Sequence, residues 1–162
     1  MLVWSFGPDL FPDRISIYLS GTSIVVAFMG TNSTNQVSEW ENSQTALVQA
    51  DPAIGLPPGL LVMKGFNDLF LASWNDNVKR ILHQLKDLLP LHPIVITDHS
   101  QGVGTSLLTA MAIAKEFSPL SIYRVITYRP PRAGNPAWAD AFDAVFKGRY
   151  TGVTNGNDWV SD

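Results

Sequence analysis

The stretch from Ile96 to Gly104, ITDHSQGVG, places a carboxylate, an imidazole and a hydroxyl on consecutive residues, of which the last is Ser100. Ser100 follows a β-rich run and precedes a helix-like run. At such a turn the hydroxyl points out of the sheet edge, and the first N–H groups of the helix face a developing negative charge, as acyl transfer requires. The two backbones pass so closely that residues 98 and 102 should be glycine, which holds for Gly102 and fails for Asp98. The local pattern therefore leaves Ser100 either a nucleophile or a serine that caps the helix.

A serine nucleophile needs a general base, and the chain holds three histidines: His83, His92 and His99. His92 precedes the strand that ends near Ser100, so five or six strand residues separate the two by roughly 17–20 Å. His99 adjoins Ser100, but neighbouring strand side chains point to opposite faces. His83 lies on an amphipathic helix, where a surface position is expected. None of the three is predicted to be the base.

The flanking pattern indicates alternating strands and helices. Two β-rich runs around Ser20-Gly21-Thr22 predict a hairpin, residues 93–98 a buried central strand, and residues 121–128 a further strand. Apolar residues at intervals of three or four predict helices over 66–89, from 103 to about 118, and over 136–146. Residues 31–65 read as one long loop, which in a compact domain is usually functional or disordered. This order predicts an α/β fold with right-handed crossovers.

Composition limits the function classes. The chain has 162 residues, 46% of them hydrophobic, with a net charge of −3 and no cysteine. We therefore expect one globular domain, no nucleic-acid partner, no disulfide and no thiolate metal site. The opening residues do not form a signal peptide, and no stretch approaches the roughly 20 apolar residues that a transmembrane helix needs.

Five segments in order carry a family resemblance. They are IVVAFMGTNSTN followed by Trp40, VMKGF, IVITDHSQG, TYRPPRAGNPAWADAFD and RYTGVTNGNDWV. The chain resembles the fungal class 3 lipases, whose α/β-hydrolase fold is a mostly parallel sheet with helices on both faces. Residues 1–162 then form a single partial domain, incomplete at its N- and C-termini.

The resemblance implies roles for particular residues. Ser100 matches the nucleophile and Asp158 the acid of the triad. Thr31 matches an oxyanion-hole residue, with the backbone N–H of Gln101 as its partner. The segment from Asn32 to about Ala46, anchored by Trp40, matches the lid.

The family's partners are also implied by the resemblance. The implied substrate is triacylglycerol or a related carboxylic ester, hydrolysed through an acyl-enzyme at a lipid–water interface, and no metal or cofactor is needed. The family is typically secreted. The sequence fixes neither the oligomeric state nor the compartment of this chain.

The chain also departs from the family pattern. Asp98 and Arg129 stand where the family has glycine, Met29 where it has arginine, and Met63 where it has histidine. Asp98 would be buried at the end of a strand, where desolvation either raises its pKa or requires a compensating partner.

The matching triad histidine does not occur among the four residues after Asp158. We therefore expect the 162 residues alone to be weakly active or inactive as an ester hydrolase. The alternative is a non-catalytic relative that binds acyl chains.

Overall fold

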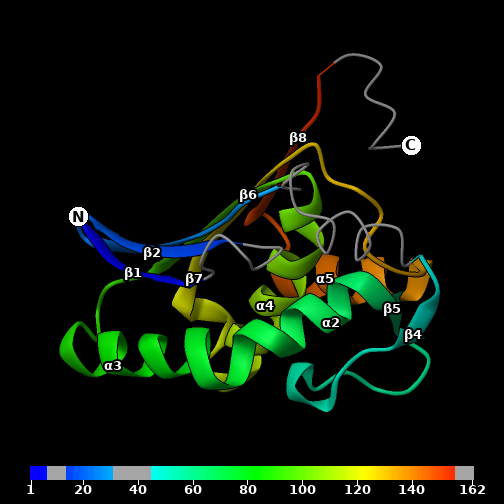
Figure 1. The fold of residues 1–162 in the computed structure, drawn as a ribbon, viewed down its shortest axis with the longest axis horizontal. Helices are drawn as coiled ribbons and strands as arrows, with labels where there is room; N and C mark the ends of the chain where they lie inside the picture. The colour runs from blue at the N-terminus through cyan, green and yellow to red at the C-terminus, as the bar shows by residue number, and fades with distance from the viewer. Residues whose placement is uncertain (7–13, 31–44, 156–162) are drawn as a thin grey trace.

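The computed structural model describes residues 1–6, 14–30 and 45–155. Six strands form one sheet in the order β1-β2-β3-β6-β7-β8 (Figure 1). Their bounds are Leu2–Phe6 for β1, Ile15–Ser20 for β2, Ser23–Phe28 for β3, Ile94–His99 for β6, Ile122–Tyr128 for β7 and Tyr150–Val153 for β8. The positions predicted for the oxyanion hole at Thr31, for the lid at Trp40 and for the triad acid at Asp158 lie outside the described residues.

The sheet changes from antiparallel to parallel at β3. β1 pairs with β2 and β2 with β3 in antiparallel register, whereas β3, β6, β7 and β8 are mutually parallel. The predicted hairpin joins β2 to β3, and Gly21 in its turn has φ +57°, a value that suits glycine. Ile24 pairs with Ile94 and Phe28 with Asp98, which brings the end of the hairpin beside residues 98–100.

Four strands were not predicted: β1, β4, β5 and β8. β1 lies in the opening residues, where the alternating pattern is too short to identify. β4 (Leu47–Gln49) and β5 (Leu61–Met63) pair as a small second sheet within residues 31–65, which the sequence indicated as one loop. Each of these two strands has only three residues, and a 3-10 turn, η1 (Pro52–Ile54), lies between them.

The helix predicted over residues 66–89 is three consecutive segments. α2 (Lys64–Ser73) continues into a π-helix, η2 (Trp74–Lys79), and then into α3 (Arg80–Leu88). Its apolar residues 66, 70, 74 and 78 recur every four positions, which in an α-helix rotates the apolar stripe by about 40° at each step. The wider π turn offsets that rotation, so Phe70, Trp74 and Val78 all remain buried.

Helix α4 (Gln101–Glu116) is the centre of the core. Every residue from 101 to 114 is buried, because α4 packs against β6 and β7 on one side and α2 on the other. In Figure 1, α2 and α3 run beneath the sheet, and α4 lies between α2 and the strands. α4 is followed by η3 (Pro119–Ser121), and α5 (Pro136–Phe146) packs on α4 and β5. This confirms the predicted mostly parallel α/β sheet with helices.

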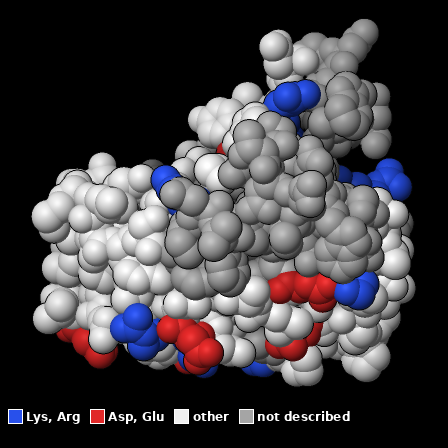
Figure 2. Space-filling model, in the orientation of Figure 1, with Lys and Arg blue, Asp and Glu red and all other residues white. Residues whose placement is uncertain are grey.

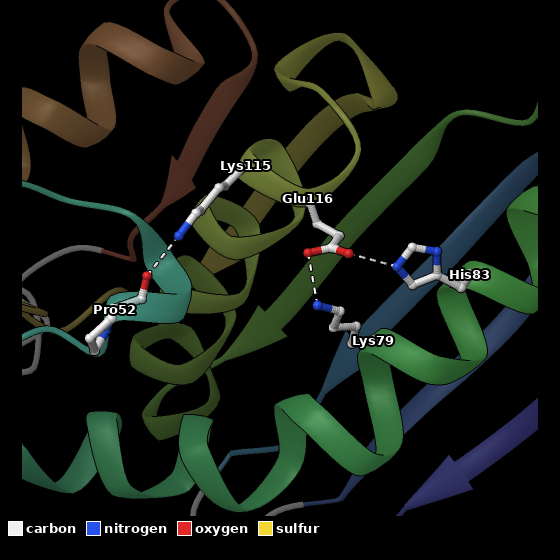
Figure 3. Close-up of polar contacts among 5 residues, drawn as sticks. All are labelled: Pro52, Lys79, His83, Lys115 and Glu116. Atoms are coloured by element: carbon white, nitrogen blue, oxygen red, sulfur yellow. Dashed lines mark hydrogen bonds and ion pairs between the residues drawn. The ribbon is translucent and has the colours of Figure 1, made fainter.

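A polar network joins the far end of α4 to the helices beneath it. Glu116 accepts a hydrogen bond from Lys79 at 2.9 Å and contacts Nε2 of His83 at 2.8 Å, while Lys115 Nζ donates to the Pro52 carbonyl at 2.7 Å (Figure 3). The hydrogen bond from Lys79, then that from His83, lowers the pKa of Glu116. Acidic and basic side chains lie beside one another along the lower, helical edge of the molecule (Figure 2).

Candidate active site

Ser100 occupies the turn between β6 and α4 with a backbone conformation that serine rarely adopts. Its φ is +54° and its ψ is −122°. Its N–H donates to the Tyr128 carbonyl at 2.9 Å, and its carbonyl accepts from the Val103 N–H at 3.0 Å. Its hydroxyl makes no helix-capping hydrogen bond. Backbone strain of this kind clusters at functional sites and costs on the order of 1–3 kcal/mol, so the geometry favours the nucleophile over the capping serine.

Two glycines allow the backbones around the Ser100 turn to approach closely. A β-carbon on Gly102 would lie 2.5 Å from the Met29 carbonyl oxygen, so the backbone of β3's exit touches the first turn of α4. A β-carbon on Gly30 would lie 2.9 Å from Nδ1 of His99 and 3.4 Å from Cβ of Ser100. Residue 30 therefore borders the Ser100 turn, and the chain just beyond it enters the segment that the resemblance assigns to the oxyanion hole.

Asp98 is accommodated by a polar partner. Asp98 is only 4% exposed, and one of its carboxyl oxygens, Oδ2, makes a short hydrogen bond with the hydroxyl of Ser106 on α4. Burial raises the pKa of Asp98 to about 7, with the Ser106 hydroxyl and a backbone hydrogen bond at Tyr128 opposing that rise. The sequence offered a raised pKa or a compensating partner as alternatives, and the structure has both.

The other departures from the family pattern are also tolerated. Arg129 has φ +56°, in the left-handed region that glycine enters without strain, which accounts for the family's glycine there. The Met63 N–H donates to the Ala133 carbonyl at 2.9 Å, and the Met29 N–H donates to the Arg14 carbonyl at 2.9 Å. At these two positions the backbone, which any residue supplies, makes the structural contact.

The described histidines lie as the sequence predicted. His83 packs on Phe117 and bonds Glu116, which lies fifteen residues along α4 from Gln101, a distance of about 22 Å at 1.5 Å per residue. His92 lies before β6, at the opposite end of that strand from Ser100. His99 is exposed beside Gly30. The structure brings Ser100 together with His99 alone of the three.

Sequence reasoning missed the polar groups around Asp98. Ser106 is fully buried on α4, and Thr127 of β7 contacts the Tyr150 hydroxyl at 3.1 Å. Coulombic repulsion from Asp98 contributes to the raised pKa of Tyr150, after burial. The sequence signal for this polar contact was a carboxylate at the end of a buried strand together with a serine on the apolar face of the next helix.

Gln101, the predicted oxyanion partner of Thr31, begins α4 and is 2% exposed. Its N–H is thus one of the N-terminal amides that an α-helix directs toward an anion. Over the described residues, no helix is long and apolar enough to cross a membrane, and no three His, Cys, Asp or Glu side chains gather to hold a metal ion.

A serine with positive φ between a central parallel strand and a buried helix is the arrangement of an α/β-hydrolase-type protein. The family model for lipase (class 3) matches residues 25–162. The chain belongs to the class 3 lipases.

Curated fungal relatives extend the match to almost the whole chain. It is 44% identical over 161 residues to Secreted mono- and diacylglycerol lipase 3 of Gibberella zeae, and 98% of this chain and 50% of that protein are covered. It is 30% identical to Secreted mono- and diacylglycerol lipase MDL3 of Malassezia globosa, over 98% of this chain and 53% of that protein. The chain thus spans about half the length of these relatives, which are named as secreted proteins.

Solved structures of fungal lipases share the fold. A fungal lipase–inhibitor complex described as a model for interfacial activation superposes with a TM-score of 0.82 at 24% identity, covering 98% of this chain and 58% of that one. A mutant form of MDLA from Penicillium cyclopium gives 0.80 at 25% identity, covering 98% and 56%. These likenesses confirm the α/β-hydrolase fold.

Proposed function

We propose that this chain carries the nucleophile of a serine ester hydrolase of the class 3 lipase type. The observation that carries the proposal is the φ of +54° at Ser100, held between β6 and α4 where Gly102 touches the Met29 carbonyl. We further propose that residues 1–162 are part of one α/β-hydrolase domain. Monoacylglycerols and diacylglycerols, on which the curated relatives are named to act, are the proposed substrates, and a secreted protein is the proposed form.

In the proposed reaction Ser100 Oγ attacks the acyl carbonyl while a histidine takes the hydroxyl proton. The N–H of Gln101 and the residue at Thr31 stabilise the oxyanion, and Asp158 orients the histidine. The alcohol leaves with that proton, and water then releases the acid from the acyl-enzyme. The relatives are about twice as long as this chain, and the proposed base is a histidine of that additional length.

The experiment is labelling of the full natural protein with a fluorophosphonate probe, with Ser100→Ala as the variant and Ser121→Ala as a control serine outside the turn. Labelling that Ser100→Ala abolishes and Ser121→Ala leaves unchanged would support the nucleophile. Hydrolysis of a monoacylglycerol and a diacylglycerol, but not a triacylglycerol, would support the substrate class.

The second candidate is a non-catalytic protein that binds acyl chains. The observation that favours it is the absence of any histidine other than His99 beside Ser100 in the described structure. A folded full-length protein that is unlabelled at Ser100, yet binds a fluorescent fatty acid, would replace the first proposal with this one.

A further inference from the structure

Asp98 is a buried carboxyl group with one oxygen that nothing in the described structure satisfies. Its Oδ2 contacts Ser106, but Oδ1 is buried and has no hydrogen-bond partner among the described residues. Leaving an ionised oxygen in that state is costly, because a buried charge needs pairing or solvation. The environment therefore favours the neutral acid.

The single proton of the Ser106 hydroxyl also indicates that Asp98 is neutral. Ser106 Oγ contacts two acceptors, the Val103 carbonyl at 2.9 Å and Asp98 Oδ2. A hydroxyl has a single proton, so it cannot donate to both. If Oδ2 carries a proton, it donates to Ser106 Oγ and Ser106 donates to Val103. Both contacts are then hydrogen bonds running in one direction.

These two hydrogen bonds connect β6 to α4 at the turn that contains Ser100. Asp98 lies two residues before Ser100 on β6, and Val103 and Ser106 lie in the first two turns of α4. The Val103 N–H is also bonded to the Ser100 carbonyl at 3.0 Å. Ionisation of Asp98 would turn the single Ser106 proton toward Oδ2 and away from the Val103 carbonyl, and it would leave a buried charge on the carboxylate where the helix begins.

We propose that Asp98 is a positioning residue, which as a neutral acid donates to Ser106 and thereby fixes the Ser100 turn in its reactive geometry. The proposal rests on Ser100 being the nucleophile. The aspartate that replaces the family's glycine thereby has a function in this chain. The same carboxyl group makes the turn sensitive to alkaline pH. The working form of the site is the protonated one.

The groups that face Asp98 allow this titration. Ser106, the uncharged Thr127 and the backbone of Tyr128 lie beside it, and Tyr150 is the one titratable group among the described residues whose charge is coupled to it. Tyr150 has a raised pKa and is neutral at ordinary pH. The pKa of Asp98, about 7, places the transition within the stable range of most proteins.

The test compares Asp98→Asn with the wild type in the full natural protein. The Asn amide donates to Ser106 as the neutral acid does, but it never ionises. The second-order rate of fluorophosphonate labelling is measured from pH 5.5 to 8.5. Because the same general base acts in both proteins, the ratio of their rates isolates Asp98. We expect a ratio near 1 at pH 5.5 and up to about 30 at pH 8.5, the reciprocal of the neutral fraction about 1.5 units above a pKa of about 7.

Two further variants separate positioning from general stability. Ser106→Ala removes the acceptor and is expected to slow labelling already at pH 5.5. Thr109→Val removes another buried hydroxyl of α4, bonded at 2.9 Å to the Thr105 carbonyl, and is expected to leave the shape of the pH profile unchanged. A ratio of Asp98→Asn to wild type that stays constant with pH would overturn the proposal.

Hydrogen exchange of the amides from 100 to 106 provides a readout that needs no reaction. After correction for intrinsic rates, the wild type should lose protection above pH 7 and Asp98→Asn should keep it. Superimposable exchange profiles would overturn the proposal. If neither protein is labelled at any pH, the proposed function of Ser100 fails, and with it the positioning role, whereas exchange still decides whether Asp98 fastens the helix.

Discussion

Gly102 and Met29 meet through their backbones, so that a β-carbon on residue 102 would lie 2.5 Å from the Met29 carbonyl oxygen. The Phe28 carbonyl oxygen would be 3.0 Å away. Phe28 pairs with Asp98 at the end of β3, and Met29 follows it directly. The glycine of the Ser100 turn is therefore fixed by the strand beside it.

Gly102→Ala should separate α4 from β3 and reduce the free energy of unfolding by about 2–4 kcal/mol, the range for a forced core overlap. Urea denaturation measures the loss, and labelling of Ser100 should slow at least tenfold. Gly148→Ala is the control, since a β-carbon there meets nothing within 4 Å and its φ of +73° costs about 1 kcal/mol without touching the site. Equal losses in the two variants would contradict the backbone contact.

Gly104→Ala tests the packing of α4 on α2. A β-carbon on Gly104 would lie 2.2 Å from the ring of Phe66. We expect a loss of about 1–3 kcal/mol in the free energy of unfolding. In Gly104→Ala combined with Phe66→Leu, the smaller side chain makes room, so the double variant should be at least about 1 kcal/mol more stable than additivity predicts. Strict additivity would show that the two residues do not compete for space.

Asn135 connects the start of α5 to Gly59 and to Leu61, the first residue of β5. Its Oδ1 accepts from the N–H of Trp138 at 2.9 Å and of Leu61 at 3.2 Å, and its Nδ2 donates to the Gly59 carbonyl at 2.9 Å. Asn135→Asp keeps the two acceptor contacts and the helix cap but loses the donor, whereas Asn135→Ala loses all three. Thermal denaturation should show a loss of about 1 kcal/mol for Asp and about 2–3 kcal/mol for Ala.

Asp98→Asn should also change how stability depends on pH. The folded pKa of about 7 exceeds the ordinary value of 3.8, so the folded protein holds a proton that the unfolded chain has released. Stability is then lost as pH rises from about 4 to 7, by roughly 4 kcal/mol, and stays level above that range. The variant should lack this loss and exceed the wild type at pH 8. If the free energy of unfolding of the wild type rose more between pH 5 and 7 than that of the variant, the assignment would be refuted.

Local patterns predicted the elements whose periodicity is regular. The β2–β3 hairpin, β6, α4 and α5 follow from alternation, apolar spacing and the turn residues around Gly21 and Pro136. The π-helix was not predicted, because apolar residues at every fourth position fit an α-helix with a slowly rotating apolar stripe nearly as well as they fit a π-helix. β4 and β5 escaped it because three-residue strands form only against each other.

The site was predictable in part for the same physical reason. Ser100 and Gly102 lie in one local motif, and the structure gives that motif the strained turn the motif predicts. Ser106 could not be identified as the partner of Asp98 from sequence, because the contact depends on how α4 lies over β6. The roles of Thr31, Trp40 and Asp158 remain predictions.

The pairing of Ile24 with Ile94 has a consequence for how the protein folds and diverges. That parallel ladder closes a chain of about 70 residues, so the strand that leads into the Ser100 turn is held in place by a long-range contact. Loop-closure entropy grows only logarithmically, by about 0.6 kcal/mol for each doubling of length. Insertions into the exposed connections between these strands therefore cost little closure entropy while the turn itself is kept, whereas the buried residues of α2 and α3 in the same segment are part of the core.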